Sequence, residues 1–283
     1  LSGHLKGSWK SDGNADSAFQ GVMFIDENPW LTETNMTVQS TSNDNKVTAT
    51  GLIGGGEVTL LFQSDKERHS ELVIKSKNGG KVLSGLGVTD TIRGGRLELR
   101  SEFKNKQFKS YSTKILIEKF HVVEAPRAIR AFSVLSLVGL YSLVEGDGTS
   151  FRRGEADLEI QGPLVNIKTI KASGDAVGIA MTGIYNRSSK KVNVSGNLVP
   201  ANLISKTLGS LPILGDLITG ADKSGVFVTQ FKVTGTSDDM KTSVNPVSSI
   251  APGLLRDFFS PDWLGKERER LLGEDETSRG VVE

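Results

Sequence analysis

The sequence has no cysteine among its 283 residues, which excludes disulfide bonds, thiol catalysis and cysteine-ligated metal sites. Aromatic residues are few, at 6%, which argues against the stacking platforms that bind single-stranded nucleic acid. Neither sign of charge is in excess, since 34 basic residues stand against 33 acidic ones, so no polyanionic partner is implied. The sequence also lacks a signal peptide and any apolar run of about 18 residues.

Residues that could carry catalysis or hold a metal ion are scattered. His4, His69 and His121 lie far apart, and none has a second ligand at the spacing of a zinc site. Gly54-Gly55-Gly56 is not followed by the Lys-Ser/Thr of a phosphate loop, so a hairpin turn is favoured. The serines of segment 132–144 have no Gly-x-Ser-x-Gly frame. We therefore predict a protein that is not an enzyme and that has no catalytic, metal or cofactor site.

The composition and the periodicity instead favour β-structure. Glycine is abundant, with 32 residues, and proline is scarce, with 8, a balance typical of many strands joined by tight turns. Apolar and polar residues alternate with a period of two, and glycine or asparagine clusters separate the alternating segments. These segments are 57–63, 71–75, 96–103, 112–120, 166–172, 176–185 and 191–196, whereas 46–52 alternates poorly but carries β-forming residues. Their order and spacing predict an antiparallel meander.

The clearest alternation lies in segment 154–161, where one face is apolar and the other acidic. Carboxylates about 7 Å apart on one strand face superficially resemble an acid–base pair. A solvated strand face explains them better, so we expect the apolar set to face a groove or core and the acidic set to face water. The apolar set is Ala156, Leu158 and Ile160, and the acidic set is Glu155, Asp157 and Glu159.

Segment 132–144 is almost entirely apolar and follows a helix start at Pro126. As a helix it would span about 20 Å, which is short of the ~30 Å hydrocarbon core of a membrane. We expect it to be buried against the sheet.

Further on, Phe227, Phe231 and Val233 share one face of a strand at 226–235. The predicted fold is therefore mostly β: a long twisted antiparallel sheet curled into a groove, with short helices at about 126–144, 201–208 and 252–259.

Several short pieces of sequence occur in a fixed order between residues 120 and 259. They are Ala125-Pro126 with 135–140 (LSLVGL), Gly196 with Val199-Pro200, 211–215 (LPILG), 225–227 (GVF), 244–246 (VNP) and 251–256 (APGLLR). In this order they resemble the C-terminal region of AsmA-like envelope proteins of Gram-negative bacteria, the group that includes AsmA, TamB and YhdP. Residues 1–125 match the family only in their strand-rich style.

The resemblance implies a strand-rich groove segment (1–125) and an AsmA-like C-terminal region (126–260). Residues 261–283 are rich in Glu and Arg without periodicity, which predicts a polar, partly disordered tail. The resemblance also implies a periplasmic location, with an inner-membrane anchor in a missing N-terminal segment. The implied function is non-enzymatic: an apolar β groove that binds phospholipid acyl chains for transport from the inner to the outer membrane, with membrane proteins as further partners. The lipid-groove candidates are Leu158, Ile160, Val177, Ile179, Met181, Phe227, Phe231 and Val233.

Two alternatives stay open at this point. One is a structural scaffold, whose core is closed by its own side chains and which docks other envelope proteins. A continuous unfilled apolar channel would separate the lipid groove from this scaffold. The other is an enzyme such as a glycan hydrolase, which would need paired carboxylates about 5–10 Å apart in a cleft. The sequence offers no candidate for such a pair.

Overall fold

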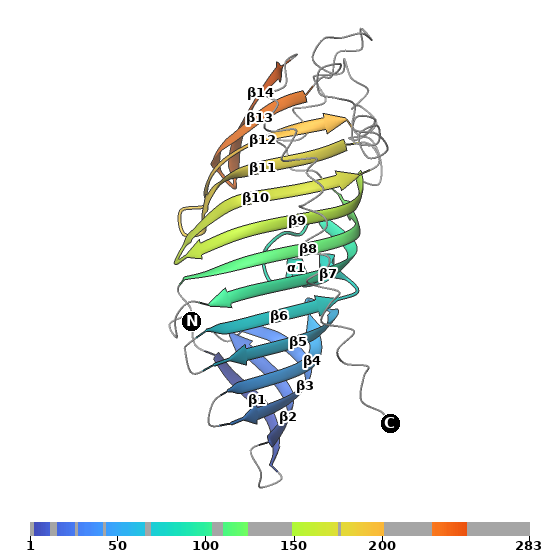
Figure 1. Ribbon diagram of the computed structural model, residues 1–283, viewed down its shortest axis with the longest axis vertical. Coiled ribbons are helices and arrows are strands. Elements are labelled where there is room, and N and C mark those ends of the chain that lie inside the picture. The colour runs from blue at the N-terminus through green and yellow to red at the C-terminus, as the bar shows by residue number, and fades with distance from the viewer. Residues whose placement is uncertain are drawn as a thin grey trace.

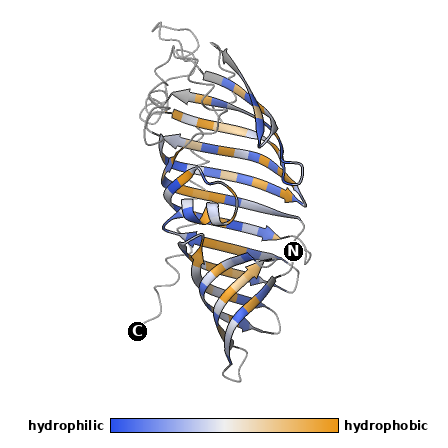
Figure 2. Ribbon diagram, turned by 180° about the vertical axis from the view of Figure 1, so that it is seen from behind, coloured by the Kyte–Doolittle hydropathy of each residue, from blue (hydrophilic) through white to orange (hydrophobic). Residues whose placement is uncertain are grey.

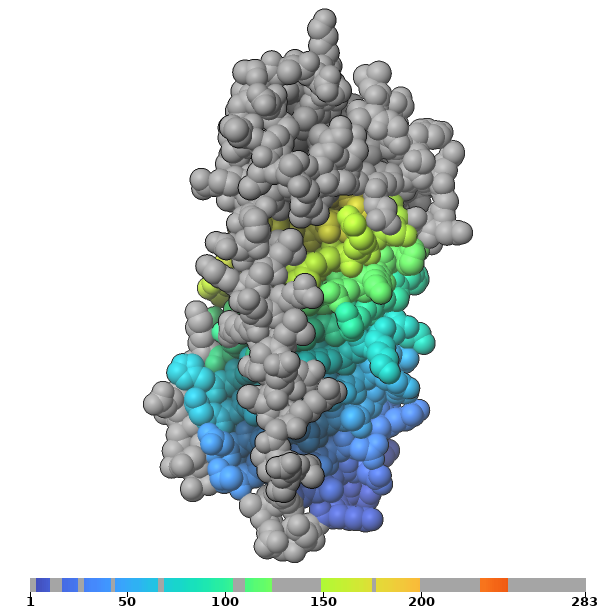
Figure 3. Space-filling view, turned by 45° about the vertical axis from the view of Figure 1, so that its right-hand side comes forward, coloured from blue at the N-terminus to red at the C-terminus, as the bar shows by residue number. Residues whose placement is uncertain are grey.

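The structure, a computed structural model, describes residues 3–11, 16–25, 28–41, 44–65, 69–103, 110–123, 149–174, 177–200 and 228–247. Within these ranges the protein is mostly β, as the sequence predicts. Fourteen strands form one long antiparallel sheet, in which each strand pairs with its neighbours in sequence (Figure 1). In the space-filling view the strands follow one another along the long axis, from the N-terminal strands in blue to β12 in yellow (Figure 3).

The strand bounds follow the predicted segments closely. The N-terminal strands are β1 (Gly3–Ser11), β2 (Asp16–Ile25), β3 (Asn28–Ser40), β4 (Asn45–Ile53), β5 (Gly56–Ser64), β6 (Ser70–Ser76) and β7 (Ile92–Phe103). The C-terminal strands are β8 (Ser110–Val122), β9 (Thr149–Gln161), β10 (Leu164–Gly174), β11 (Val177–Asn186), β12 (Lys191–Pro200), β13 (Val228–Thr236) and β14 (Asp239–Val247). The glycine turn is confirmed, because Gly54 and Gly55 have φ of 58° and 76° in the tight turn between β4 and β5.

Side chains alternate between two faces of the sheet. We call the face that carries the buried apolar cluster the inner face, and the opposite face the outer face. Figure 2 shows this alternation as orange and blue segments along the strands, and it shows the short helix α1 lying in front of the sheet in that view. The acidic and apolar sets of β9 lie on opposite faces, since Ala156 pairs with Ile115 whereas Asp157 pairs with Lys114.

Two residues shift the phase of this alternation within a strand. In β3 the inward residues change from Leu31 to Thr34, Met36 and Val38, and Glu33 lies between them with φ of 51°. In β8 they change from Ile117 to Phe120, and Lys119 has φ of 56°. A residue in the left-handed conformation shifts the alternation by one position, so that the side chains after it point to the opposite faces, as in a β-bulge.

The helix α1 (Gly79–Gly85) was not predicted from the sequence, and neither was β2. The helix has only seven residues and three of them are glycines, so no amphipathic repeat can be recognised in it. Its first turn is capped by the Asn78 side chain, whose Oδ1 accepts a hydrogen bond of 3.3 Å from the amide of Lys81. In β2, Gly21 interrupts the alternation, because it packs against Gly7 of β1 where no Cβ would fit.

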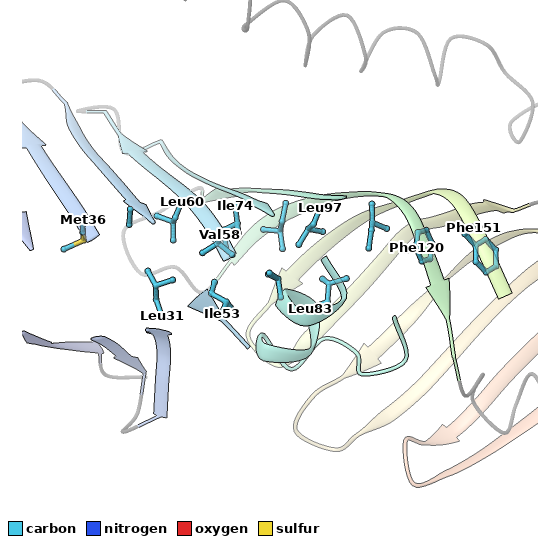
Figure 4. Packing of buried hydrophobic residues seen from close by; sticks show 14 of the residues in the cluster. Leu31, Met36, Ile53, Val58, Leu60, Ile74, Leu83, Leu97, Phe120 and Phe151 are labelled. Carbon is cyan, nitrogen blue, oxygen red and sulfur yellow. The ribbon is translucent and has the colours of Figure 1, made fainter. Parts of the chain in front are cut away.

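The buried core runs along the inner face of the sheet from β2 to β13, and α1 packs on part of it. Val82 and Leu83 of α1 are 0% and 2% exposed, and Leu31 and Ile53 are both 0% exposed. Figure 4 shows Leu31, Ile53 and Leu83 on one side of the cluster and Leu60, Ile74 and Leu97 on the other, so that the two sets face each other. The sheet therefore curls enough for its own strand ends and α1 to cover the inner face of β4–β7.

Several predictions lie outside the described residues. They are the helices at about 126–144, 201–208 and 252–259, the tail 261–283 and the groove candidate Phe227. Among the residues that the structure describes, no helix is long and apolar enough to cross a membrane.

Candidate functional site

The candidate site is the inner face of the sheet, where one row of cross-strand neighbours is apolar from β1 to β13. Each strand contributes one residue, and each residue pairs with the next in the antiparallel register. The row is Trp9, Phe19, Met36, Ala49, Leu60, Ile74, Leu99, Ile115, Ala156, Ile170, Met181, Gly196 and Phe231. Every side chain in the row is apolar apart from the indole nitrogen of Trp9.

The structure brings the described groove candidates together on this face. Met181 and Phe231 belong to the row and lie on either side of Gly196. Leu158 and Val233 belong to the adjacent row, which runs through Ile167, Gly183 and Val194. The remaining candidates also face inward: Ile160 in β9, and Val177 and Ile179 in β11.

Phenylalanine rings cover glycines of neighbouring strands on this face. A Cβ built on Gly196 would lie 2.6 Å from Cζ of Phe231, and one built on Gly154 would lie 3.0 Å from the ring of Phe120. The rings thus occupy the space that larger side chains would need, an arrangement that stabilises glycine within a sheet. Ring and glycine together form an apolar surface without a projecting side chain at the glycine.

Two sets of residues on the inner face differ in burial. The first, which we call the sealed segment, consists of the inward residues of β3–β8 together with α1. In it Ile74 is 1% exposed, Leu97 1% and Ile117 4%. The second, which we call the half-buried patch, is made of the inward residues Ala156, Leu158, Ile167, Ile170, Ile179 and Met181, all of intermediate exposure. Other inward residues of the same strands are as buried as the sealed segment: Ile160 is 5% exposed, Val177 4%, Val194 7%, Leu198 8% and Phe231 9%.

Sequence reasoning did not identify Ile170 as part of this surface, because it stands three residues after Ile167, out of phase with a regular strand. The register of β10 shifts between these residues on both of its sides, which marks a bulge near Lys168. The spacing of two isoleucines at i and i+3 in a strand is the signal that could have indicated this bulge.

One polar pair interrupts the inner face in the sealed segment. The hydroxyls of Ser101 and Thr113 are 2.8 Å apart and form a hydrogen bond, and both residues are buried. Two other buried hydroxyls donate to backbone carbonyls: Thr34 to Leu31 at 2.9 Å and Ser76 to Glu57 at 2.6 Å. Buried hydroxyls with partners are tolerated in an apolar core, so these groups fit a structural role.

The outer face carries the charged residues, mostly as cross-strand ion pairs. Arg100 pairs with Glu71 at 2.6 Å, and Arg96 with Glu118. Two members of the acidic set of β9 are also paired: Glu155 with Arg153 of the same strand, and Glu159 with Lys168 of β10 at 2.6 Å. The hydrogen bond to Glu159 raises the pKa of Lys168 above its usual value. Segment 154–161 therefore has an ion-paired outer face where the sequence suggested a merely solvated one.

A hollow of about 1220 Å³ lies on the outer face across β3–β9, and its lining is charged. It contains Glu98, Glu118, Lys75, Arg96 and Arg153. Each of these groups has a partner of opposite charge, for example Lys75 and Glu98 at 3.6 Å and Arg153 and Glu118 at 3.5 Å. The hollow thus holds an ion-pair network with balanced charge.

The described part of the chain contains no group of three side chains suited to hold a metal ion. His4 stacks on Phe24, and His69 lies 3.7 Å from Asp65, on separate parts of the sheet.

Comparisons with family models, with curated proteins and with solved structures give no match to this chain. The described residues define the class: a single antiparallel β sheet with an apolar inner face and an ion-paired outer face.

Proposed function

We propose that the inner face of β9–β13 binds phospholipid acyl chains, and that the protein is a non-enzymatic lipid-handling segment of a periplasmic envelope protein that supports supply of phospholipid to the outer membrane. The observation that carries this proposal is the apolar row with its half-buried patch. The inward Ile, Leu and Met side chains of the patch are contiguous and only partly covered, and an apolar occupant would remove them from water.

Burial of hydrocarbon would supply the binding energy. Each methylene removed from water contributes about 0.8 kcal/mol, so an acyl chain needs no specific polar contact to bind such a surface. Headgroups would remain in water, since the polar residues of these strands lie on the outer face. Such binding lets an acyl chain slide along the inner face, because the hydrophobic interaction has no preferred direction.

A pair of isoleucines in β11 provides a matched test. Ile179 faces inward within the half-buried patch, and Ile184 is 46% exposed on the outer face. The chain and its variants Ile179→Lys and Ile184→Lys are purified from bacterial membranes, and co-purified phospholipid is measured by native mass spectrometry. We expect the inner-face charge to reduce bound lipid by about tenfold, because it places an ammonium group among acyl chains.

Bound lipid in the Ile184→Lys protein should equal that of the unchanged chain. Equal loss in the two variants would indicate a general effect on folding or solubility. Absence of phospholipid from the folded, unchanged chain would refute the proposal.

The sealed segment favours a second candidate function, a structural scaffold that docks other envelope proteins. Leu60, Ile74 and Leu97 are covered by Leu31, Ile53 and α1, as in an ordinary core (Figure 4). If this function applied to the whole molecule, Met181 and Ile179 would be covered in the same way and no lipid would bind.

A further inference from the structure

We propose that α1 closes one end of the acyl-chain site, so that a chain bound along β9–β13 stops at a wall formed by Ile117, Phe120 and Phe151. This inference rests on the proposed function and specifies the site further. The inner face would then hold one end of a lipid in a blind pocket, and acyl chains would not pass along its whole length.

The packing of α1 leaves no space beneath the helix. A Cβ added to Gly79 would lie 2.8 Å from Cβ of Leu97, and one added to Gly80 would lie 2.5 Å from the carbonyl oxygen of Ile92. Non-bonded carbon atoms need about 3.5–4.0 Å. Where a single carbon does not fit, a methylene chain cannot pass between α1 and the sheet.

The C-terminal end of α1 is held against the turn between β4 and β5. A Cβ on Gly85 would lie 2.5 Å from the amide nitrogen of Gly54, and Nζ of Lys81 donates a hydrogen bond of 3.3 Å to the carbonyl oxygen of Gly55. Ile53, at the end of β4, is 0% exposed. Helix, turn and strand end therefore form one continuous barrier across the inner face.

The wall next to the half-buried patch is aromatic. Phe120 and Phe151 stack with ring centroids 5.3 Å apart and an interplanar angle of 14°, and each is 4% exposed. Ile117 is equally buried and contacts Gly79, at the start of α1. The row passes from the sealed residue Leu99, which is 7% exposed, to Ile115, Ala156, Ile170 and Met181, which are all half-buried, and it ends at Phe231, which is 9% exposed. The half-buried stretch of the row therefore begins beside this wall.

Two methionines of the same row allow a test without changing the side-chain size. Met36 lies in the sealed segment and is 7% exposed, and Met181 lies in the half-buried patch. The chain is produced with photo-methionine, whose diazirine reacts with whatever contacts it. It is then incubated with vesicles of phosphatidylethanolamine and phosphatidylglycerol and irradiated. Adducts are located by peptide mass spectrometry.

We expect lipid adducts at Met181 and only intramolecular cross-links at Met36, for example to Phe19 or Ala49, its neighbours in the row. Those cross-links also show that the diazirine at Met36 was active. Lipid adducts at both positions would overturn the blind pocket while supporting the proposed function. Lipid adducts at neither position would refute the proposed function itself.

Chain-length selectivity provides a second measurement. Replacing Leu83 with Ala removes part of the barrier, and Val88→Ala serves as control because Val88 is 55% exposed beside the helix. If α1 sets the end of the pocket, Leu83→Ala should bind longer acyl chains. The ratio of bound 18-carbon to bound 14-carbon phospholipid should then rise about tenfold, which is the low end of the selectivity that added methylenes give in an apolar pocket. An unchanged ratio in a folded Leu83→Ala protein would contradict the proposal.

Discussion

Lys119 and Glu33 adopt left-handed backbone conformations that residues with side chains rarely occupy. Each stands where the inward phase of its strand shifts, so the strain is linked to the placement of Phe120 and of Thr34 on the inner face. The cost is of the order of 1–2 kcal/mol per residue. The gain is the burial of side chains that a regular strand would direct to water.

Replacing Lys119 with Gly should therefore stabilise the fold. Glycine adopts positive φ freely, but it loses about 0.5–1 kcal/mol of conformational entropy on folding. The expected net effect is a rise of about 0.5–1 kcal/mol in the free energy of unfolding, measured by urea denaturation. Lys119 is exposed, so no packing is lost.

Lys46 is the control, because it is an exposed lysine in the regular part of β4. Lys46→Gly should lower the free energy of unfolding by about 0.5–1 kcal/mol. If both substitutions destabilised the protein equally, the left-handed conformation of Lys119 would not be a source of strain.

Among the elements, β7 and β8 are joined within the core by the hydroxyl pair of Ser101 and Thr113. Removing one hydroxyl leaves the other buried without its partner, which costs about 1–3 kcal/mol. We expect Ser101→Ala and Thr113→Val each to destabilise by this amount. The double variant should be less destabilised than the sum of the two.

The difference is the coupling energy of a double-mutant cycle, and thermal or urea unfolding gives it directly. The exposed side-chain hydrogen bond from Gln20 to Asn35, 2.7 Å long, offers a comparison on the outer face. Its coupling should be below about 0.5 kcal/mol, because water replaces either partner. Additive effects at Ser101 and Thr113 would show that water reaches the pair.

The strands could be predicted because their alternation is local. Segments such as 57–63 and 112–120 carry the period of two in consecutive residues, and the Gly54-Gly55 turn has its own sequence signal. The helix α1 could not, since its glycines are explained only by the sheet that they contact. The division into a sealed segment and a half-buried patch depends on curvature, which no single segment encodes.

The whole molecule is held together mainly by contacts between strands that are consecutive in the chain. Every strand pairs with its predecessor, and α1 packs chiefly on β7, with further contacts to β4 and β5. The sealed segment with α1 lies entirely before residue 123. Most of its buried residues pack on one another, and its contacts to later strands are made by β8, which pairs with β9 and carries the stack of Phe120 on Phe151.

We predict that a fragment of residues 1–123 folds by itself, which would test the domain boundary expected near residue 125. We expect a cooperative thermal transition by circular dichroism, at a lower temperature than that of the full chain because Phe120 loses its partner. Ile74→Asp in the same fragment should abolish the transition, because Ile74 is 1% exposed in the core. A fragment that melts without cooperativity would show that β9 and later strands are required.

The order of the strands also has a consequence for how the protein is made. A sheet in which every strand pairs with the one before it contains no long-range pairing that must wait for the C-terminus. Loop closure between consecutive strands is entropically inexpensive, and such folds form from local contacts. As the chain leaves the ribosome or a translocation pore, each new hairpin can add to a sheet already in place. The growing edge of the nascent sheet then moves along with synthesis. At any moment only the latest strand and β1, at the opposite end of the sheet, present an unpaired edge that is open to aggregation.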